Sequence, residues 1–495
     1  MFKRIIALLL CVFTLVGMTA CSGDETSEDA SKTDSSADVS TDSSTDSSTD
    51  SSEGESSVAD DPANYVDKEG YEQFLKVSAI DELLAERGFK DQGANSDYVP
   101  LNYDKMKAMW ISQFDFQRAY GNGIKQRSES TFREYVERAY DNILTLGFNT
   151  VIVQVRPNAD SFYPSAYYPY SYYVVGGYGR MEKYDPIQIM LDVAHEKGLS
   201  FHAWINPMRG MSTTDLSKVD AEYPMKSWTL DGNKSRFLFN NVDDSLNYLN
   251  ISYEEVRQLI IKGAAEIVRY YDVDGVHMDD YFYFDGTNQT KLDDEELKQA
   301  ISKDATMNIK KFRFQNLNTL VSGIYSAIKA ENKNVLFGIS PAGNLDQMAS
   351  KYYADMDTWL SQDGYLDYIM PQIYFGMEHQ NWGFATTYQR WSAVIKNPKI
   401  KFMVGISLGK AVAAQKGQGD RYAGTGVNEW IENKDVVKKC LAYSASQSNF
   451  SGYAFFCYQY FWDATSGVQN DYTVEELNNC KAYLTDIIKG ERIQY

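Results

Sequence analysis

The chain contains little cysteine, little histidine and no excess of positive charge. Five Cys and four His are spread over 495 residues, without a CxxC pair or any other metal-ligand spacing. We therefore expect neither a bound metal nor a cofactor. The formal net charge is −20, and the sequence has no basic patch, which argues against a nucleic-acid partner.

Three cysteines, Cys440, Cys457 and Cys480, lie far from the N-terminus. We expect them to be buried free thiols. A Cys440–Cys480 disulfide between two late helices is the alternative, since disulfides form outside the cell.

The first 21 residues have the pattern of an export signal. Lys3 and Arg4 form a charged start, residues 5–16 an apolar middle, and residues 17–20 a small-residue exit. The apolar run is too short for a membrane-spanning helix. Because Cys21 follows "MTA", the segment resembles a bacterial lipobox. We expect Cys21 to be lipidated and to anchor the protein outside the cytoplasmic membrane, with an ordinary cleaved signal as the alternative.

Residues 22–62 are a Ser, Thr, Asp and Glu segment with repeats such as "TDSSTDSSTDSSEGESS". This segment has 13 acidic residues against one Lys, which makes −12 of the net charge. With almost no apolar side chains it cannot offset the entropy of ordering, so we expect a disordered tether. The remaining part, about 430 residues long, is then only mildly acidic and suits one large barrel.

That remaining part alternates between short apolar runs and segments with helical periodicity. The apolar runs are 107–116, 149–158, 200–209, 272–283, 334–343, 366–376, 400–409 and 451–462. The helical segments are 131–146, 185–197, 252–271, 307–332, 353–362, 384–396, 434–447 and 473–489. Eight strands alternating with eight helices predict an α/β fold, a (β/α)₈ TIM barrel, whereas a doubly wound open sheet is the main alternative.

We expect the barrel to span residues 103–495, preceded by a short extension, 63–102, that packs on it. Long loops follow the second, third and fourth strands, at the C-terminal mouth where such barrels keep their active sites. The first of these loops is rich in Tyr, as in "DSFYPSAYYPYSYYVVGGYGR". Packing would explain some of these rings, but a polar rim rich in aromatic rings also suits sugars.

Polar residues follow several of the expected strands. The fourth ends in adjacent carboxylates, Asp279 and Asp280, for which a buried strand has no use. Because successive side chains of a strand point to opposite faces, one set from each strand should line the barrel. That inward set is Gln154, Arg156, His202, Trp204, Asn206, His277, Asp279, Tyr281, Met370, Gln372 and Tyr374. Arg156 needs a carboxylate or an anionic ligand, and Asp279 is its nearest candidate partner.

The runs "VQVRPNADSFYPS", "YDPIQIMLDVAHEKGLSFHAWINPMR", "YDVDGVHMDDYFY", "FGISPAGN" and "YIMPQIYFG" resemble glycosyl hydrolase-like family 10, in the family's order. The resemblance implies a (β/α)₈ barrel acting on bacterial polysaccharide, similar to peptidoglycan glycosidases that cut glycan strands free of stem peptides. Its motifs contain Arg156, Asn158, Asn206, Asp279, Asp280, Gln372 and Tyr374. The "SPAGN" segment departs from the bulkier aromatic form expected there, so a subsite near residues 342–344 is in doubt.

Glycosidases commonly use two carboxylates. For the second one the sequence offers Glu378, Asp115, Asp160 and Asp346, none at the end of the fifth or sixth strand. A 2-acetamido sugar can instead supply its own nucleophile. We therefore hypothesise that Asp279 orients the acetamide and that Asp280 is the general acid and base, with a pKa raised by its neighbour. Inversion with Asp279 as the acid remains open. Trp204, His277 and Tyr281 complete the expected substrate-binding set.

Two other functions fit the same residues. A barrel could bind cell-wall glycan without cutting it. The segment "KGQGDRYAGTG" after the seventh strand could bind phosphate, but its glycines lack the strand–helix context of a nucleotide fingerprint. The expected partners are a polysaccharide and, through Cys21, a membrane.

Overall fold

The computed structural model describes residues 95–178 and 182–495. The expected signal peptide, Cys21 and the tether of residues 22–62 lie outside the described residues, as does most of the 63–102 extension. Among the described residues, no helix has both the length and the apolar character needed to cross a bilayer.

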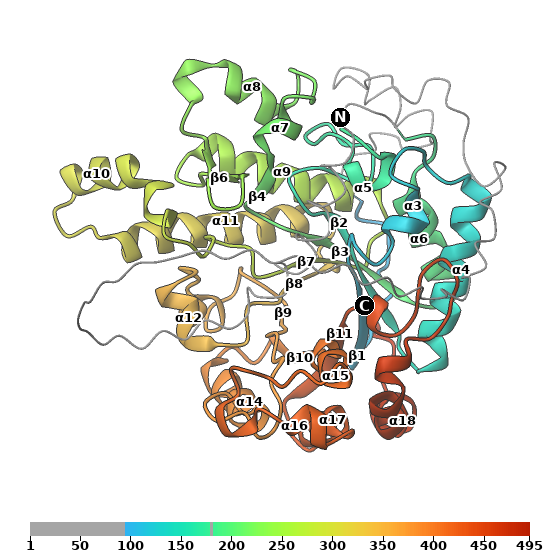
Figure 1. Cartoon of the computed structure of the whole chain (residues 1–495). Helices are drawn as coiled ribbons and strands as arrows, with labels where there is room; N and C mark the ends of the chain where they lie inside the picture. The colour runs from blue at the N-terminus through green and yellow to red at the C-terminus, as the bar shows by residue number, and fades with distance from the viewer. Residues whose placement is uncertain (1–94, 179–181) are drawn as a thin grey trace, which may run out of the picture. The chain divides into compact units, whose positions relative to one another are not determined.

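Eight parallel strands close into a barrel in the order β1-β11-β10-β9-β8-β7-β3-β2 (Figure 1). They are β1 Met106–Ile111, β2 Thr150–Arg156, β3 Ser200–Ile205, β7 Gly275–Met278, β8 Leu336–Ile339, β9 Tyr368–Ile369, β10 Lys401–Ser407 and β11 Phe450–Phe456. Six lie within apolar runs that the sequence assigned to strands, and β1 and β11 each begin one residue before theirs. The closed sheet confirms the (β/α)₈ barrel over the open doubly wound sheet.

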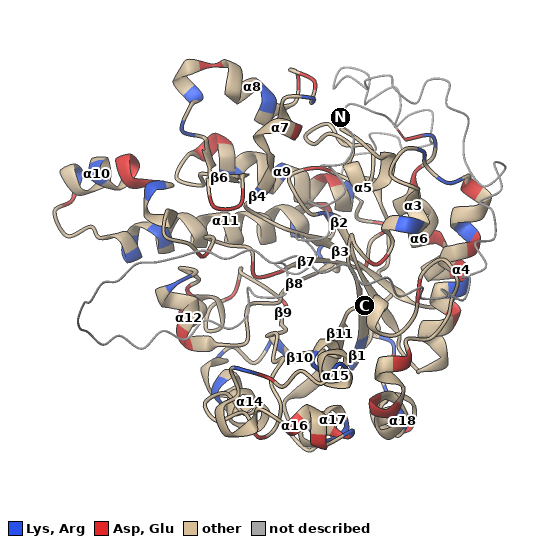
Figure 2. Cartoon of the chain, viewed as in Figure 1, with Lys and Arg blue, Asp and Glu red and all other residues tan. Residues whose placement is uncertain are grey.

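Helices alternate with the barrel strands. The main ones are α4 Glu129–Thr145, α6 Pro186–Glu196, α9 Glu254–Tyr270, α11 Ile309–Glu331, α13 Met356–Trp359, α14 Phe384–Val394, α17 Val436–Ala445 and α18 Val474–Ala482. Additional helices in the connections are α3 Gln117–Tyr120, α5 Tyr172–Val175, α10 Asp294–Lys303, α12 Leu345–Ser350, α15 Gly409–Gln415 and α16 Glu429–Glu432. Figure 2 shows Lys and Arg interspersed with Asp and Glu along these helices.

Local sequence explains where these elements begin and end. At the start of α6, the Asp185 carboxylate accepts from Ile187 N and Gln188 N, and Pro186 occupies the first helical position. Gly198 follows that helix with φ 72°, a conformation that favours glycine. The strand β9 has only two residues because Pro371, shortly after it, has no N–H for a ladder.

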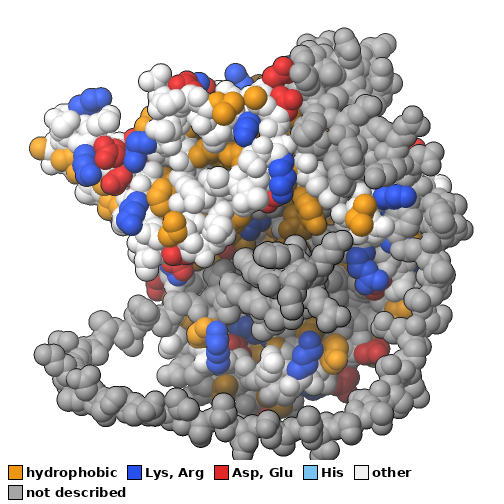
Figure 3. Space-filling model, turned by 45° about the horizontal axis from the view of Figure 1, so that its top comes forward, with side chains coloured by type: hydrophobic (Ala, Val, Ile, Leu, Met, Phe, Trp, Pro, Cys, Tyr) orange, Lys and Arg blue, Asp and Glu red, His pale blue; other side chains and the backbone are white. Residues whose placement is uncertain are grey.

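The loop after β3 folds into a layer of its own that the sequence did not predict. It contains β4 Arg209–Ser212, α7 Thr213–Leu216, α8 Pro224–Leu230, β5 Leu238–Asn240 and β6 Leu246–Leu249. The three strands form an antiparallel sheet in the order β4-β6-β5, at the C-terminal end of β3. The space-filling view shows hydrophobic side chains in small groups between charged ones on this face of the molecule (Figure 3).

Polar side chains inside the barrel form a continuous hydrogen-bonded chain. The Tyr368 hydroxyl lies 2.9 Å from His277 Nδ1 and 3.0 Å from His202 Nδ1, and His202 Nε2 lies 2.9 Å from Asn102 Oδ1. Burial lowers the pKa of His202 to about 3 and that of His277 well below its ordinary value. Both imidazoles are therefore neutral, and the chain supports the barrel from within.

Cys440, Cys457 and Cys480 are buried free thiols, which confirms that expectation over the disulfide. Burial is also the largest cause that raises the pKa of each thiol, so none has the character of a reactive thiolate.

Candidate active site

Two adjacent carboxylates, Asp279 and Asp280, follow β7 at the C-terminal mouth of the barrel. Asp279 is 3% exposed and accepts hydrogen bonds from Trp204 Nε1 at 2.9 Å and from the Tyr281 backbone N–H at 3.1 Å. Asp280, which is half-buried, accepts from Gln372 Nε2 at 3.0 Å. The ends of β3, β7 and β9 therefore bring Trp204, the two carboxylates and Gln372 together. Strand alternation predicted this for Trp204, Asp279 and Gln372, but not for Asp280.

Both carboxyl groups hold a proton more firmly than an exposed Asp does. Burial and then the charge of Asp280 raise the pKa of Asp279, against smaller opposing effects of Arg209 and the two hydrogen bonds. Burial, rather than the charge of Asp279 as expected from the sequence, raises the pKa of Asp280, while the Gln372 hydrogen bond and Arg209 lower it. Because two like charges this close oppose each other's ionisation, the pair can hold one proton where ordinary Asp side chains are fully ionised.

The cation beside this pair is Arg209, which the sequence reasoning missed. It begins β4 and is the last residue of the third apolar run, 200–209, directly after "INPM". Its guanidinium lies 4.0 Å from the centroid of the Tyr281 ring, and its Nε donates to Pro157 O at 3.1 Å. Two signals in the sequence pointed to it: its place at the end of an expected strand, as for Arg156, and its place as the last residue of the motif "YDPIQIMLDVAHEKGLSFHAWINPMR".

Arg156 is not inside the barrel, and its expected pairing with Asp279 is wrong. The pairing of β2 with β3 is regular up to Gln154 and then shifts by one residue, so that Arg156 pairs with Ile205. This bulge turns Arg156 towards the helices. Its guanidinium lies over Tyr168, 4.5 Å from the ring centroid. It also lies against α9, where a Cβ on Gly263 would be 2.5 Å from Nη1.

Amide side chains link the ends of the first three strands. The Gln113 backbone N–H donates to Gln154 Oε1 at 2.9 Å, and Gln154 Nε2 donates to Asn206 Oδ1 at 2.7 Å. Asn206 is 1% exposed, and its Nδ2 has no hydrogen-bond partner in the structure. An unpaired buried amide is costly, so Asn206 is the amide of this row best suited to donate to a ligand.

Three further residues of the expected substrate-binding set have different surroundings. His277 is fully buried below the mouth, where Trp110 Nε1 donates to its Nε2 at 3.3 Å. Tyr374 is half-buried and stacks on Phe456, with ring centroids 6.0 Å apart. Asn158 is also half-buried, and its backbone N–H donates to Asp160 at 2.8 Å. His277 thus belongs to the hydrogen-bonded interior of the barrel, whereas Tyr374 and Asn158 remain partly exposed.

Of the four other carboxylates proposed from the sequence, Asp115, Asp160 and Asp346 are engaged in contacts of the fold, whereas Glu378 is exposed. Asp160 stabilises the loop after β2, because its carboxylate accepts from the Asn158 backbone N–H at 2.8 Å and from the Tyr178 hydroxyl at 3.0 Å. Asp115 accepts from Ser112 N and from Gln459 N at 2.8 Å, and burial raises its pKa to about 6. Asp346 is exposed and paired with Arg390. The acid pair after β7 is thus the strongest candidate for proton transfer.

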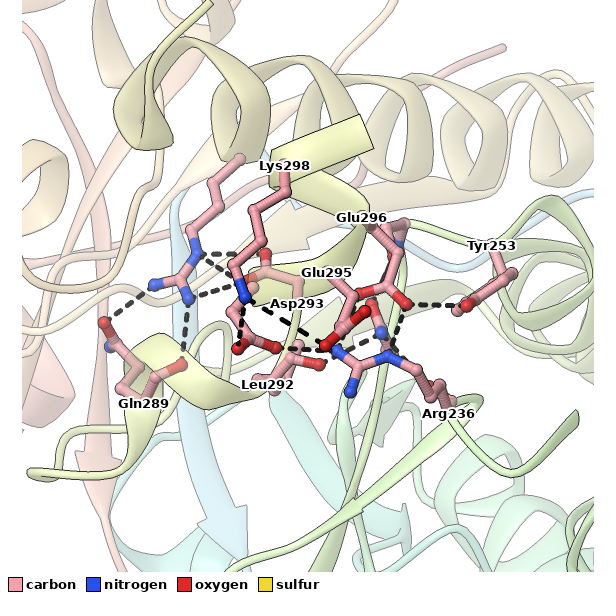
Figure 4. Close-up of polar contacts among 12 residues, drawn as sticks. Arg236, Tyr253, Gln289, Leu292, Asp293, Glu295, Glu296 and Lys298 are labelled. Atoms are coloured by element: carbon pink, nitrogen blue, oxygen red, sulfur yellow. Dashed lines mark hydrogen bonds and ion pairs between the residues drawn. The ribbon is translucent and has the colours of Figure 1, made fainter. Parts of the chain in front are cut away.

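The loop that carries the acid pair is anchored at its far end. Arg313 of α11 and Asp293 form a completely buried ion pair at 2.6 Å, and Arg313 also donates to Gln289 Oε1 and Gln289 O, each at 2.8 Å. Next to it, Arg236 and the Tyr253 hydroxyl both bind Glu296, as Figure 4 shows. These contacts fix residues 281–296 against α11.

The family described as Glycosyl hydrolase-like 10 matches residues 105–423. The chain belongs to this family. It is 35% identical over 324 residues to Glycosyl hydrolase YngK of Bacillus subtilis (strain 168), across 61% of this chain and 60% of that protein. It is 30% identical over 359 residues to Glycosyl hydrolase DigH of Escherichia coli (strain K12), across 67% of this chain and 79% of that protein. The chain thus spans less than two thirds of the length of YngK.

A solved structure with a similar course of the chain is the PgaB (BpsB) glycoside hydrolase domain from Bordetella bronchiseptica. The two are 9% identical, with a TM-score of 0.46, over 78% of this chain and 99% of that domain. A similarity this low carries no argument about activity. Family membership supports a carbohydrate-acting glycosidase. The reaction and the substrate depend on the residues of the site.

Proposed function

We propose that the protein is a glycoside hydrolase that cuts bacterial polysaccharide, and that its substrate is the glycan strand of peptidoglycan after the stem peptides have been removed. The observation that carries the proposal is the acid pair, Asp279 and Asp280, held at the barrel mouth by Trp204 and Gln372. A buried pair of carboxyls that retains a proton can protonate a leaving glycosidic oxygen.

The sugars of peptidoglycan carry an acetamide, and this group can replace a protein nucleophile. In the proposed reaction the acetamide N–H donates to Asp279, so the proton of the pair is held by Asp280. The acetamide oxygen attacks the anomeric carbon while the glycosidic C–O bond breaks and Asp280 protonates the leaving oxygen. Asp280 then takes a proton from the water that opens the cyclic intermediate. Two displacements at one carbon retain its configuration.

The test incubates the full chain with peptide-free glycan strands and identifies the products by mass. Asp279→Asn and Asp280→Asn should each lower the rate by about 10²–10⁴-fold, the range for loss of general acid–base catalysis. Asp346→Asn, an exposed carboxylate on α12, should cleave as the unaltered chain does. Binding without cleavage by the unaltered chain would instead favour a glycan-binding protein, and an inverted anomeric product would rule out acetamide assistance.

We further propose that Cys21 carries a lipid anchor that holds the enzyme on the outer side of the cytoplasmic membrane, next to this substrate. The proposal is supported by the lipobox-like "MTAC" and the polar segment that follows it. Cys21→Ser should move the protein from the membrane fraction to the soluble fraction. A variant that stays in the membrane fraction would contradict the anchor.

A further inference from the structure

Two large aromatic side chains are exposed at the barrel mouth. Phe114, shortly after β1, is 56% exposed, and Tyr172, the first residue of α5 in the loop after β2, is 39% exposed. Both follow the C-terminal ends of barrel strands, as the acid pair does. Because each ring leaves a large part of its apolar surface in water, that part contributes no burial free energy and is open to a ligand.

The two rings are held in place by a third. Tyr173 lies between them, with its ring centroid 5.8 Å from Phe114 at 89° and 5.9 Å from Tyr172 at 87°. Tyr173 in turn packs on the buried Phe162 at 6.3 Å. The Ser171 hydroxyl, which is buried, accepts from the Tyr173 backbone N–H and caps α5. The exposed rings therefore stand on the core as a fixed aromatic platform, defined here as Phe114, Tyr172 and Tyr173.

The aromatic platform adjoins the row of amides at the barrel mouth. Phe114 follows Gln113, whose backbone N–H donates to Gln154 Oε1 at 2.9 Å. Gln154 Nε2 in turn donates at 2.7 Å to Asn206, the buried amide whose Nδ2 has no hydrogen-bond partner. The exposed rings thus stand beside polar groups at the same end of the barrel as the acid pair.

We propose that Phe114 and Tyr172 form a sugar-binding subsite that takes the apolar face of a pyranose ring at least one unit away from the bond cut at the acid pair. This inference rests on the proposed function. Sugars present C–H groups on their ring faces and hydroxyls at their edges, so a flat aromatic side chain matches the face and leaves the edge to water. The occupant is a glycan strand, because the aromatic platform continues the site that would cut it. A short substrate that fills only the positions beside the acid pair does not reach the rings.

The test measures binding apart from cleavage. Glycan strands of several defined lengths are titrated into full-length Asp279→Asn protein, alone and with Phe114→Ala, Tyr172→Ala or both. We expect each ring removed to weaken binding of long strands by about tenfold, which corresponds to one stacking contact. The shortest strands should bind with unchanged affinity. Tyr472→Ala is the matched control. Tyr472 is 47% exposed, but it lies just before α18 with Lys416 Nζ over its ring, and it is not part of the aromatic platform.

The outcomes separate this inference from the proposed function. Unchanged affinity for long strands in the Phe114→Ala and Tyr172→Ala variants would overturn the subsite while cleavage by the unaltered chain still stood. An equal loss for short and long strands would also overturn it. Conversely, a length-dependent loss of binding in a protein that cleaves nothing would support the subsite and refute the hydrolase.

Discussion

At the residue scale, the ionisation of the acid pair depends on one cation. Arg209 is the positive charge that lowers the pKa of both Asp279 and Asp280, against the burial that raises them. It acts as a positioning residue as well, since it supports Tyr281 and binds Pro157 O. Its removal should therefore change the pH dependence of cleavage as well as its rate.

We predict that Arg209→Gln moves the pH–rate profile of kcat/KM to higher pH. Without the guanidinium both carboxyls keep their protons to higher pH, so the acidic and the alkaline limbs both rise. The measurement is cleavage of glycan strands across the pH range. Arg390→Gln, which removes a cation paired with Asp346 on the surface of α14, serves as the control. A profile that loses height but keeps its position would show that Arg209 does not tune the pair.

A second prediction concerns Glu266 of α9, which accepts from Ser165 Oγ and Ala166 N. Burial raises its pKa to about 7 from 4.5, with Arg156 opposing the shift. The folded protein thus binds more protons than the unfolded chain between these values. The stability from this group is complete below pH 4.5 and is lost as pH rises through 7, by at most about 3 kcal/mol.

Glu266→Gln should remove that part of the pH dependence. The variant and the unaltered chain should have similar free energies of unfolding near pH 4.5, and the variant should be relatively more stable above pH 7. Denaturant unfolding at several pH values measures the difference. Glu134→Gln, on a 72% exposed side chain, is the control. Parallel pH profiles for Glu266→Gln and the unaltered chain would contradict the prediction.

The comparison of Arg156 with Arg209 shows which site residues can be predicted from sequence. Strand alternation correctly brought Trp204, Asp279 and Gln372 together, because one residue of every two faces the barrel interior. It failed at Arg156, since a single-residue bulge reverses the face and leaves no mark in the local pattern. The charge assigned to Arg156 is supplied by Arg209, from a strand outside the barrel.

At the element scale, the loop after β7 is positioned by the Arg313–Asp293 ion pair. The Arg313 guanidinium lies between the rings of Tyr283 and Tyr353, 4.5 and 4.6 Å from their centroids, and its pair with Asp293 is closed to water. Gln289 Nε2 extends the anchor to Lys351 O at 2.8 Å. Arg313 thus holds the loop after β7, and through Gln289 this loop is joined to the segment that follows α12.

We predict that Arg313→Met lowers the free energy of unfolding by about 3–5 kcal/mol, because Asp293 would remain buried without its partner. The double variant Arg313→Met with Asp293→Leu should recover part of that loss. Thermal and denaturant unfolding of the three proteins test this. An Arg313→Met loss no larger than that of the exposed-pair variant Lys399→Met would show that the ion pair does not anchor the loop.

The barrel elements could be predicted because their apolar runs and glycine or proline boundaries are local signals. The sheet β4-β6-β5 could not. Its strands have three or four residues each, too few for a periodic pattern, and they pair residues as far apart in the sequence as Arg209 and Tyr248. Arg209 belongs to this sheet, so the missed element and the missed site residue have the same origin.

At the scale of the whole molecule, one buried carboxylate closes the N-terminal end of the barrel. Asp274, just before β7, is fully buried and accepts from Leu101 N, from Phe201 N at 2.7 Å and from the Tyr98 hydroxyl at 2.6 Å. His195 Nε2 lies 2.9 Å from its second oxygen. Asp274 therefore joins the segment before β1 to strands in the middle of the chain.

The C-terminal segment meets this closure as well. Asn102 Nδ2 donates to Asp274 O at 2.9 Å and to the Tyr495 hydroxyl at 3.0 Å, and Tyr103 forms a bridge with Arg492. The parts of the chain on either side of the barrel are thus held at the end away from the acid pair. In such barrels the N-terminal end usually serves stability, and the C-terminal end carries the active site.

We predict that Asp274→Asn lowers the free energy of unfolding by about 3 kcal/mol, because the amide NH₂ turns one acceptor into a donor facing buried N–H groups. The midpoint of thermal unfolding should fall, while kcat/KM of the remaining folded protein should stay unchanged, since Asp274 lies at the opposite end from Asp279. Asp272→Asn is the matched control, because Asp272 is exposed and accepts a hydrogen bond from Asn95 Nδ2 at 3.0 Å. A loss of kcat/KM without a loss of stability would contradict the prediction, because it would show that Asp274 affects the acid pair at the other end of the barrel.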